Sequence, residues 1–170
     1  MNPRYDVYAI GNALVDTEIE VSDDFLARMH IDKGLMTLVD EARQQELTQA
    51  LARTPAKRAA GGSACNSIVA VCRFGGTAFY SCKVADDADG AFYLADLAGA
   101  GADCNLRAPL PQGTTGKCLV LVSPDAERSM NTFLGISADI SVDETDLDAL
   151  AQSRWLYLEG YLASSPSGRA

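Results

Sequence analysis

The sequence offers little for binding a metal ion: it has one histidine, His30, and five cysteines with no CxxC pair. Zinc sites need cysteines and histidines at close spacing, so this pattern argues against zinc. An odd number of scattered cysteines predicts free thiols and a cytoplasmic protein. The N-terminal run MNPRYDVYAIGNALVD is too interrupted to be a signal peptide or a membrane span, so we expect no membrane partner. The cysteines are Cys65, Cys72, Cys82, Cys104 and Cys118.

An excess of positive charge is also missing. Lys and Arg number 14 against 23 Asp and Glu, the formal net charge is −9, and the basic residues form no stripe. Affinity for nucleic acid depends on neutralising phosphates, so we expect no nucleic-acid partner. The GxGxxG fingerprint is absent, which argues against a nucleotide-binding oxidoreductase. The 48% of apolar residues is typical of a globular domain with a substantial core.

Apolar runs alternate with amphipathic stretches along most of the chain. The patterns predict strands at 5–11, 77–85 and 154–163, and helices at 41–54, 64–74, 88–102 and 143–153. Asp40 is a plausible N-cap for the first of these helices, and Pro55 is a stop signal after it. Strands that alternate with helices predict an α/β fold, in which a parallel sheet carries helices on both faces.

Two hairpin-like segments, 16–40 and 116–135, do not fit that parallel sheet. Their polar and apolar residues alternate, so we expect them to form a separate small sheet with one face in water. The last predicted strand is followed only by SSPSGRA, which we interpret as a loop. Because the elements amount to half of a typical doubly wound domain, we expect this domain to be incomplete, with an uncovered face on the last strand.

The segment GGSACN at 61–66 places two glycines before a helix. One interpretation is simple turn chemistry. The other is a binding site, because glycines expose backbone N–H groups at a helix N-terminus to a polar ligand. Asn66 falls in the first turn of that helix, where its amide can point the same way as those donors. Gly61, Gly62 and Asn66 are therefore candidate site residues.

The segment GNALVD at 11–16 follows the first buried strand. In open α/β sheets, ligands bind beyond the carboxyl ends of the strands, which is where Asn12 and Asp16 are expected. A carboxylate there can accept two hydrogen bonds from the vicinal hydroxyls of a sugar. The alternative is that Asp16 only caps a turn.

Together with FLARMHIDKGLMTLVDE, DDADG, ERSMNTFLG and YLEGYL, these segments resemble the N-terminal half of ribokinase-like sugar kinases of the PfkB family. Among its members, the resemblance is greatest to those similar to adenosine kinase. It implies a three-layer α/β/α fold with a mainly parallel sheet and a small β lid, of which residues 1–170 are the N-terminal part. The lid would comprise about 16–40 and 116–135, and the ATP-binding half would lie outside this chain.

The resemblance also implies a reaction, in which ATP phosphorylates a primary hydroxyl of a furanose sugar or nucleoside. The acceptor would be held by Asn12, Asp16, Gly61, Gly62, Asn66 and Glu159, the last as the strand-end acid that some sugar-binding members use. ATP and Mg²⁺ would bind mostly outside this chain, and no catalytic residue is expected within it. A homodimer through the lid is a further expectation. The alternative is a non-catalytic fragment that binds a sugar or nucleoside.

The segment DLAGAGAD at 96–103 is similar to the family's catalytic signature DTxGAGD, but an extra alanine precedes Asp103. It also ends a predicted helix, where the helix dipole disfavours an anion. We therefore expect Asp103 to lie far from Asp16 and Asn66. Two other points stay open. Cys65 is near a helix N-terminus, where its pKa could fall, or it is a small core residue. Met29, Met36 and Met130 either line a pocket or pack the lid.

Overall fold

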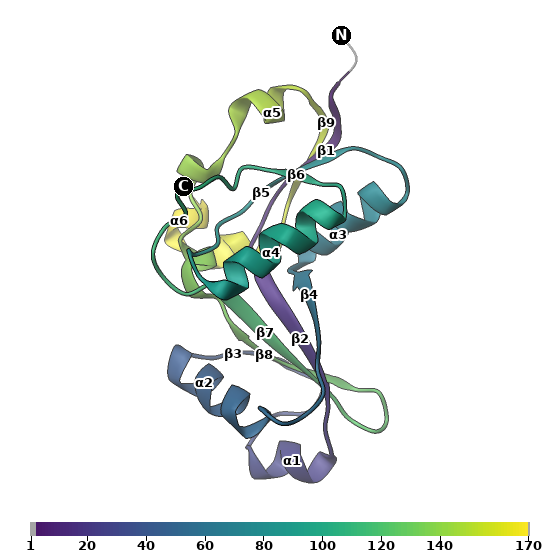
Figure 1. The fold of residues 1–170 in the computed structure, drawn as a ribbon, viewed down its shortest axis with the longest axis vertical. Coiled ribbons are helices and arrows are strands. Elements are labelled where there is room, and N and C mark those ends of the chain that lie inside the picture. Colours follow the sequence, from purple (N-terminus) through teal and green to yellow (C-terminus); the bar gives the residue numbers. More distant parts are fainter. Residues whose placement is uncertain (1–2, 170) are drawn as a thin grey trace.

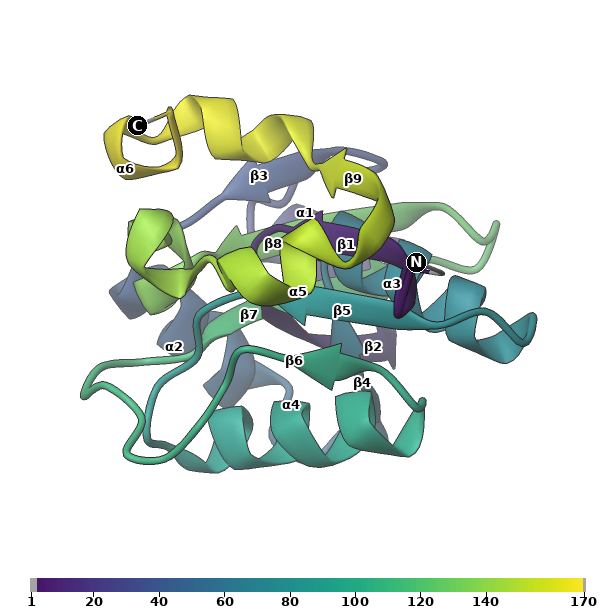
Figure 2. The ribbon, with the colours of Figure 1, turned by 90° about the horizontal axis from the view of Figure 1, so that it is seen from above.

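The computed structural model describes residues 3–169, which form two sheets (Figure 1). The first sheet has four parallel strands in the order β6-β5-β1-β9, which Figure 2 shows from above. This confirms the prediction that 5–11, 77–85 and 154–163 lie parallel in one sheet. The strands are β1 (Tyr5–Ile10), β5 (Ala78–Ser81), β6 (Asp103–Cys104) and β9 (Ser153–Leu158).

Helices cover both faces of the first sheet. On one face, α3 (Ser63–Arg73) and α4 (Ala88–Gly99) contribute Ile68, Tyr93 and Leu97 to the main core. On the other face, Tyr8 stacks on Phe79 at a centroid distance of 5.4 Å, and Ala149 of α5 (Leu147–Ala151) packs against them. Successive residues of β1 therefore serve the two cores in turn, as a buried parallel strand requires.

The second sheet has five strands in the order β3-β8-β7-β2-β4 and corresponds to the predicted lid. Figure 1 shows it below the first sheet, with α1 (Asp23–Arg28) and α2 (Glu41–Ala50) beside it. Asp40 is the N-cap of α2, as predicted, and the helix ends before Pro55. The strands are β2 (Leu14–Glu20), β3 (Met36–Leu38), β4 (Lys57–Gly61), β7 (Gly116–Val122) and β8 (Arg128–Phe133).

The interpretation of 16–40 as a hairpin is wrong. Strand β2 pairs in parallel with β7, and β3 pairs in parallel with β8, so β2 and β3 are not neighbours. The reason is that α1 and the loop after it carry the chain past β7 and β8 before β3 forms. The segment 116–135 is an antiparallel hairpin, as predicted. The sequence patterns also missed β4, which pairs antiparallel with β2 at the other edge.

The two faces of the second sheet differ in character because side chains alternate along each strand. Ile19, Leu119 and Leu121 point to one face and pack against Phe25 and Leu47 of the two helices. The side chains on the opposite face point toward the first sheet. They include Leu14, Asp16, Cys118, Met130 and Thr132.

Several predicted elements near the C-terminus are shorter or differently shaped. The helix predicted at 143–153 is a 3-10 turn, Val142–Glu144, followed by α5, which begins where Asp146 caps it. The strand predicted at 154–163 ends at Leu158, because Leu158 pairs with Ile10, the last residue of β1. A 3-10 turn (Gly160–Ser164) follows. The segment predicted as a loop contains α6 (Pro166–Arg169), which starts with a proline. Residue 170 lies outside the described residues.

No helix among residues 3–169 combines the length and the apolar character that crossing a bilayer requires. The strand β9 forms an edge of the first sheet, and Trp155 and Leu158 on it are exposed to 69% and 58%. Because side chains alternate along a strand, Trp155 and Leu158 lie on opposite faces, so both faces of β9 are exposed, where the sequence predicted one uncovered face.

Asp87 connects α4 to the chain that enters the second sheet. Its carboxylate caps α4 by accepting from Gly90 N at 2.7 Å, and it accepts from Thr115 N and Oγ1 at 2.9 and 2.6 Å. Burial acts to raise the pKa of Asp87, but the hydrogen bonds from Thr115 and Gly90 outweigh it, so the pKa is lowered.

We expect Asp87→Ala to lower the free energy of unfolding by about 2–3 kcal/mol, because three donors lose a charged acceptor. Urea unfolding at pH 7 measures this loss, and Asp24→Ala, at an exposed position in α1, is the control. Since the folded-state pKa is lowered, the loss should shrink as the pH falls through that pKa. Equal stability of the variant and the wild type at pH 7 would contradict this role for Asp87.

Candidate functional site

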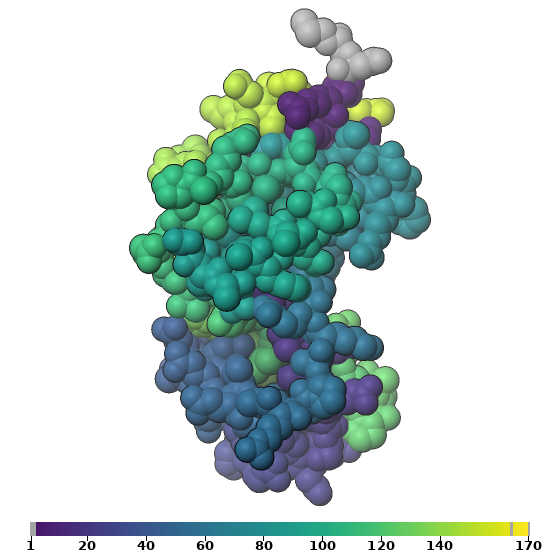
Figure 3. Space-filling view, viewed as in Figure 1, coloured from purple at the N-terminus to yellow at the C-terminus, as the bar shows by residue number. Residues whose placement is uncertain are grey.

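A pocket of about 240 Å³ lies between the second sheet and the carboxyl ends of β1 and β9. The space-filling view shows the molecule hollowed on one side between the parts built on the two sheets (Figure 3). Of the six residues predicted to bind a ligand, five line this pocket, and they come from three separate segments of the chain. They are Asn12, Asp16, Gly62, Asn66 and Glu159.

The sixth predicted residue, Gly61, lies directly behind the Asp16 carboxyl group. A Cβ atom on Gly61 would fall 2.2 Å from both Cγ and Oδ2 of Asp16. Strands β4 and β2 pair so that Leu14 is opposite Gly61, which brings the Asp16 side chain across the glycine. The absence of a side chain at Gly61 therefore leaves the room that the carboxyl group occupies.

Gly62 makes the sharp turn from β4 into α3. Its φ is 100°, in the left-handed region that favours glycine, and an added Cβ would lie 2.3 Å from the carbonyl oxygen of Asn12. As the N-cap of α3, it lets the first turn of an 11-residue helix open onto the pocket. The positive end of the helix dipole and its N–H groups can there meet polar atoms of a ligand.

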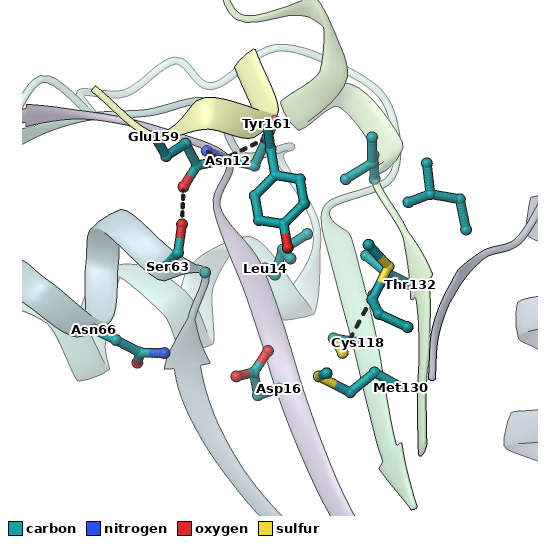
Figure 4. Close-up of a pocket in the computed structure, with 14 residues that line it drawn as sticks. Asn12, Leu14, Asp16, Ser63, Asn66, Cys118, Met130, Thr132, Glu159 and Tyr161 are labelled. Carbon is teal, nitrogen blue, oxygen red and sulfur yellow. Dashed lines mark hydrogen bonds between the residues drawn. The ribbon is translucent and has the colours of Figure 1, made fainter. Parts of the chain in front are cut away.

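Asp16 provides a carboxyl group without hydrogen-bond donors among residues 3–169. Figure 4 shows this group and the Asn66 amide pointing into the same space, from β2 and α3. Burial raises the pKa of Asp16 to about 6, against the lowering effect of the Arg128 charge. A half-buried carboxyl group that lacks protein donors is available to a ligand with hydroxyl groups.

Glu159, at the carboxyl end of β9, is 4% exposed and holds Asn12 and the start of α3. Its Oε1 accepts from the backbone N of Asn12 at 2.8 Å and from Nδ2 of Asn12 at 2.7 Å. Its Oε2 accepts from Ser63 Oγ at 2.9 Å and from Ala64 N at 3.2 Å. The dashed lines in Figure 4 mark the side-chain bonds. Glu159 thus joins three elements at the edge of the pocket.

Two buried tyrosines support the same loops from the core, and sequence reasoning missed them. The Tyr80 hydroxyl donates to the Asn12 carbonyl at 3.1 Å, and the Tyr93 hydroxyl donates to the Gly61 carbonyl at 3.2 Å. Both residues lie in segments whose apolar pattern indicates core packing. Nothing in the local sequence shows which carbonyl a buried hydroxyl will reach.

The wall opposite Asn66 is apolar and comes from the second sheet. Met36 and Met130 line the pocket, whereas Met29 packs with the core beneath α1, which answers the question left open for these three residues. Thr132 Oγ1 donates to Cys118 Sγ at 3.3 Å, which satisfies the hydroxyl next to this wall. The other apolar residues of the wall are Leu14, Leu38 and Leu134.

Asp103 is at the opposite end of the strands. It begins β6, next to Phe79, and accepts a hydrogen bond from the hydroxyl of Tyr5, the first residue of β1, at 2.6 Å. The pocket is at the carboxyl ends, so the structure separates Asp103 from Asp16 as its helix-end position predicts. Cys65 is fully buried, and burial raises its pKa to about 11, which excludes an activated thiolate.

Within residues 3–169, no group of three or more His, Cys, Asp or Glu side chains could hold a metal ion. The polar groups of this pocket are instead one carboxyl group without protein donors, side-chain amides and the N–H groups of a helix N-terminus. Such groups fit a neutral ligand with several hydroxyls.

The Asp16 pKa predicts an unusual effect on stability. A folded-state pKa raised from 3.8 to about 6 means that the group stabilises the fold below pH 3.8 and that this contribution is lost as the pH rises through 6. We expect Asp16→Asn to raise the free energy of unfolding at pH 7 by roughly 1–3 kcal/mol. Urea unfolding at pH 7 and pH 4 measures the gain, most of which should be gone at pH 4. A variant less stable than wild type at both pH values would contradict this assignment.

Comparisons with known proteins agree with this geometry. Residues 34–169 match the model of a family described as pfkB family carbohydrate kinase. Over 98% of the chain, the structure is similar to an adenosine kinase from Sinorhizobium meliloti (TM-score 0.87, 38% identity) and to a probable sugar kinase protein from Rhizobium etli CFN 42 (TM-score 0.88, 34% identity). A fructokinase from Escherichia coli is 30% identical over 109 residues, which are 64% of this chain and 36% of the fructokinase. The chain spans 50% of each of the two solved structures.

Proposed function

The chain belongs to the pfkB family of carbohydrate kinases, and on this basis we propose that it forms the acceptor-binding part of an enzyme that phosphorylates a furanose sugar or nucleoside. ATP would supply the phosphoryl group, and a primary hydroxyl of the acceptor would receive it. The observation that carries the proposal is the Asp16 carboxyl group, which lacks protein donors within residues 3–169 and faces Asn66 and the start of α3 across one pocket.

Each pocket residue then has a role in holding the acceptor. Asp16 accepts hydrogen bonds from two vicinal hydroxyls, which replace the water that burial removes. The Asn66 amide and the N-terminus of α3 offer donors to the ring or hydroxyl oxygens. The Nδ2 of Asn12 is held by Glu159, so the Oδ1 of Asn12 is the atom left for the acceptor. Gly61 and Gly62 keep the space open.

Of the two acceptor classes, we favour a nucleoside. A free furanose has hydroxyls on every side and would leave the apolar wall of the pocket unused. A nucleoside carries a flat apolar base, and the polarisable sulfurs of Met36 and Met130 are suited to contact an aromatic ring. The name of the Sinorhizobium meliloti relative, an adenosine kinase, agrees with this choice. A free sugar is the second candidate, since the Escherichia coli relative is a fructokinase.

Phosphoryl transfer needs positioning and charge stabilisation more than covalent chemistry. Mg²⁺ bound with ATP neutralises phosphate charge in such reactions. Residues 3–169 lack a cluster suited to a metal ion, so we assign no Mg²⁺ ligand to this chain. The family resemblance implies that the catalytic base also lies outside it. The chain spans half the length of the two solved relatives, and we propose that the other half of the whole protein supplies the Mg²⁺ ligands and the catalytic base. Location in the cytoplasm and a homodimer through the second sheet stay predictions.

Calorimetry with adenosine, ribose and fructose tests acceptor binding, and transfer of labelled phosphate from ATP in the whole protein tests catalysis. We expect adenosine to bind more tightly than either sugar and to be phosphorylated at its primary hydroxyl. Binding without transfer by the whole protein would favour the alternative of a non-catalytic binding protein. Failure to bind any of the three compounds would refute the proposal.

A further inference from the structure

We propose that Glu159 is a positioning residue, whose carboxylate fixes the end of β1 to the start of α3 and does not bind the acceptor. This differs from the role that the family resemblance implies for the strand-end acid. The effect on acceptor affinity rests on the proposed function, whereas the effect on the end of β1 and the start of α3 does not. The inference comes from the bonds and the space around this one side chain.

The hydrogen-bonding capacity of the Glu159 carboxylate is already used. An ionised carboxylate has about four lone-pair sites and no proton to donate. Four protein donors occupy them: two from Asn12 on Oε1, and one each from Ser63 and Ala64 on Oε2, all at 2.7–3.2 Å. A hydroxyl of an acceptor would have to displace one of these donors and leave it unsatisfied, which costs more than the new bond returns.

The space around the carboxylate also holds it in place. A Cβ atom on Gly11 would lie 2.5 Å from Oε2 of Glu159 and 2.6 Å from the Cβ of Ala64. The carboxylate is therefore wedged between the Gly11 backbone and the first turn of α3. Because Glu159 is 4% exposed, it cannot turn toward the pocket without moving one of these elements. The glycine of GNALVD is what makes this close approach feasible.

Fixing these loops determines what the pocket presents. With N and Nδ2 of Asn12 bound to Oε1, the side-chain amide has one orientation, and its Oδ1 is the free atom. The bonds to Ser63 and Ala64 set the direction of α3, and hence the position of Asn66 one turn later. A negative charge at the N-terminus of α3 is also favourable for the helix dipole.

Glu159→Gln tests the proposal with little change in volume. The glutamine can keep its oxygen toward Asn12 and donate its amide to Ser63 Oγ, but the N–H of Ala64 then has no acceptor. In hydrogen-exchange NMR, we expect the Ala64 amide to lose protection at least tenfold. Amides of the second sheet, such as Leu119, should keep theirs and show that the protein is folded. Unchanged protection of Ala64 would overturn the proposal, whether or not the pocket binds a nucleoside.

Acceptor binding separates positioning from direct contact. Calorimetry would compare adenosine with 2′-deoxyadenosine, 3′-deoxyadenosine, 5′-deoxyadenosine and purine riboside, which lacks the exocyclic amine. A positioning residue predicts that Glu159→Gln weakens all five by the same factor, about tenfold, and that Ser63→Ala weakens them two- to threefold. A contact predicts that the loss disappears for the one analogue that lacks the contacted group. That outcome would overturn the proposal, and Asp16→Asn provides the reference for a true contact.

Discussion

Replacing Gly61 by Ala is expected to weaken acceptor binding by about a hundredfold or more, although Gly61 offers no side chain to the ligand. The new Cβ atom would overlap Cγ and Oδ2 of Asp16, at 2.2 Å, so the carboxyl group must leave its place in the pocket. Each hydrogen bond to a charged acceptor is worth about 1.5–3 kcal/mol. Losing two of them at the lower figure amounts to about 3 kcal/mol, which is a factor of roughly a hundred.

The matched control is Gly99→Ala, because an added Cβ at the end of α4 meets no atom within 4 Å. It should leave affinity for adenosine unchanged in calorimetry. A second comparison uses the Asp16→Ala background, where Gly61→Ala should cause little further loss, since the group that it displaces is gone. Equal losses from Gly61→Ala with and without the Asp16 side chain would show that the glycine acts in another way.

The parts of this site that sequence reasoning found are those that local patterns determine. Asn12 follows a buried strand, and Asn66 falls one turn into a helix that two glycines precede. The carboxyl ends of parallel strands meet at one edge of a sheet, so such residues converge once the strands pair. The prediction of one parallel sheet with a separate second sheet needed only the change from continuous to alternating apolar residues.

The parts that sequence reasoning missed depend on contacts between distant segments. Strand β4 reads KRAAG, with two charged and three small residues, and it is a strand because β2 offers it an edge. Gly61 looks like part of a turn, and only the register of β4 against β2 shows why it must lack a side chain. The partners of Glu159 lie 95–147 residues away, beyond the reach of any local pattern.

The error over 16–40 has a similar cause. The alternation within 16–40 correctly predicts strand residues with two different faces, and the structure places β2 and β3 in this segment. Proximity in sequence favours a hairpin, but α1 packs Phe25 and Leu26 under the sheet and leads the chain to the far edge. Burial of that apolar helix face outweighs the short connection that a hairpin would need.

Asp16→Asn is expected to weaken acceptor binding at pH 7 by at least about tenfold and to remove its dependence on pH. The substitution keeps the shape of the side chain but removes its charge, so hydrogen bonds worth about 1.5–3 kcal/mol each become weaker. Burial raises the pKa of Asp16 to about 6, so the wild-type carboxyl group is ionised at pH 7 and mostly protonated at pH 5.

Calorimetry with adenosine between pH 5 and pH 8 measures both effects in the whole protein. Wild-type affinity should increase as the pH rises through 6 and then level off, because the ionised form accepts the hydroxyl hydrogen bonds. The Asn variant should bind weakly and equally at every pH, and its affinity for ATP should match that of the wild type. Binding and stability then depend on pH in opposite directions, because the ionised group that stabilises the complex destabilises the empty fold. Wild-type affinity that is the same at pH 5 and pH 8 would exclude the Asp16 carboxylate as the group that holds the acceptor.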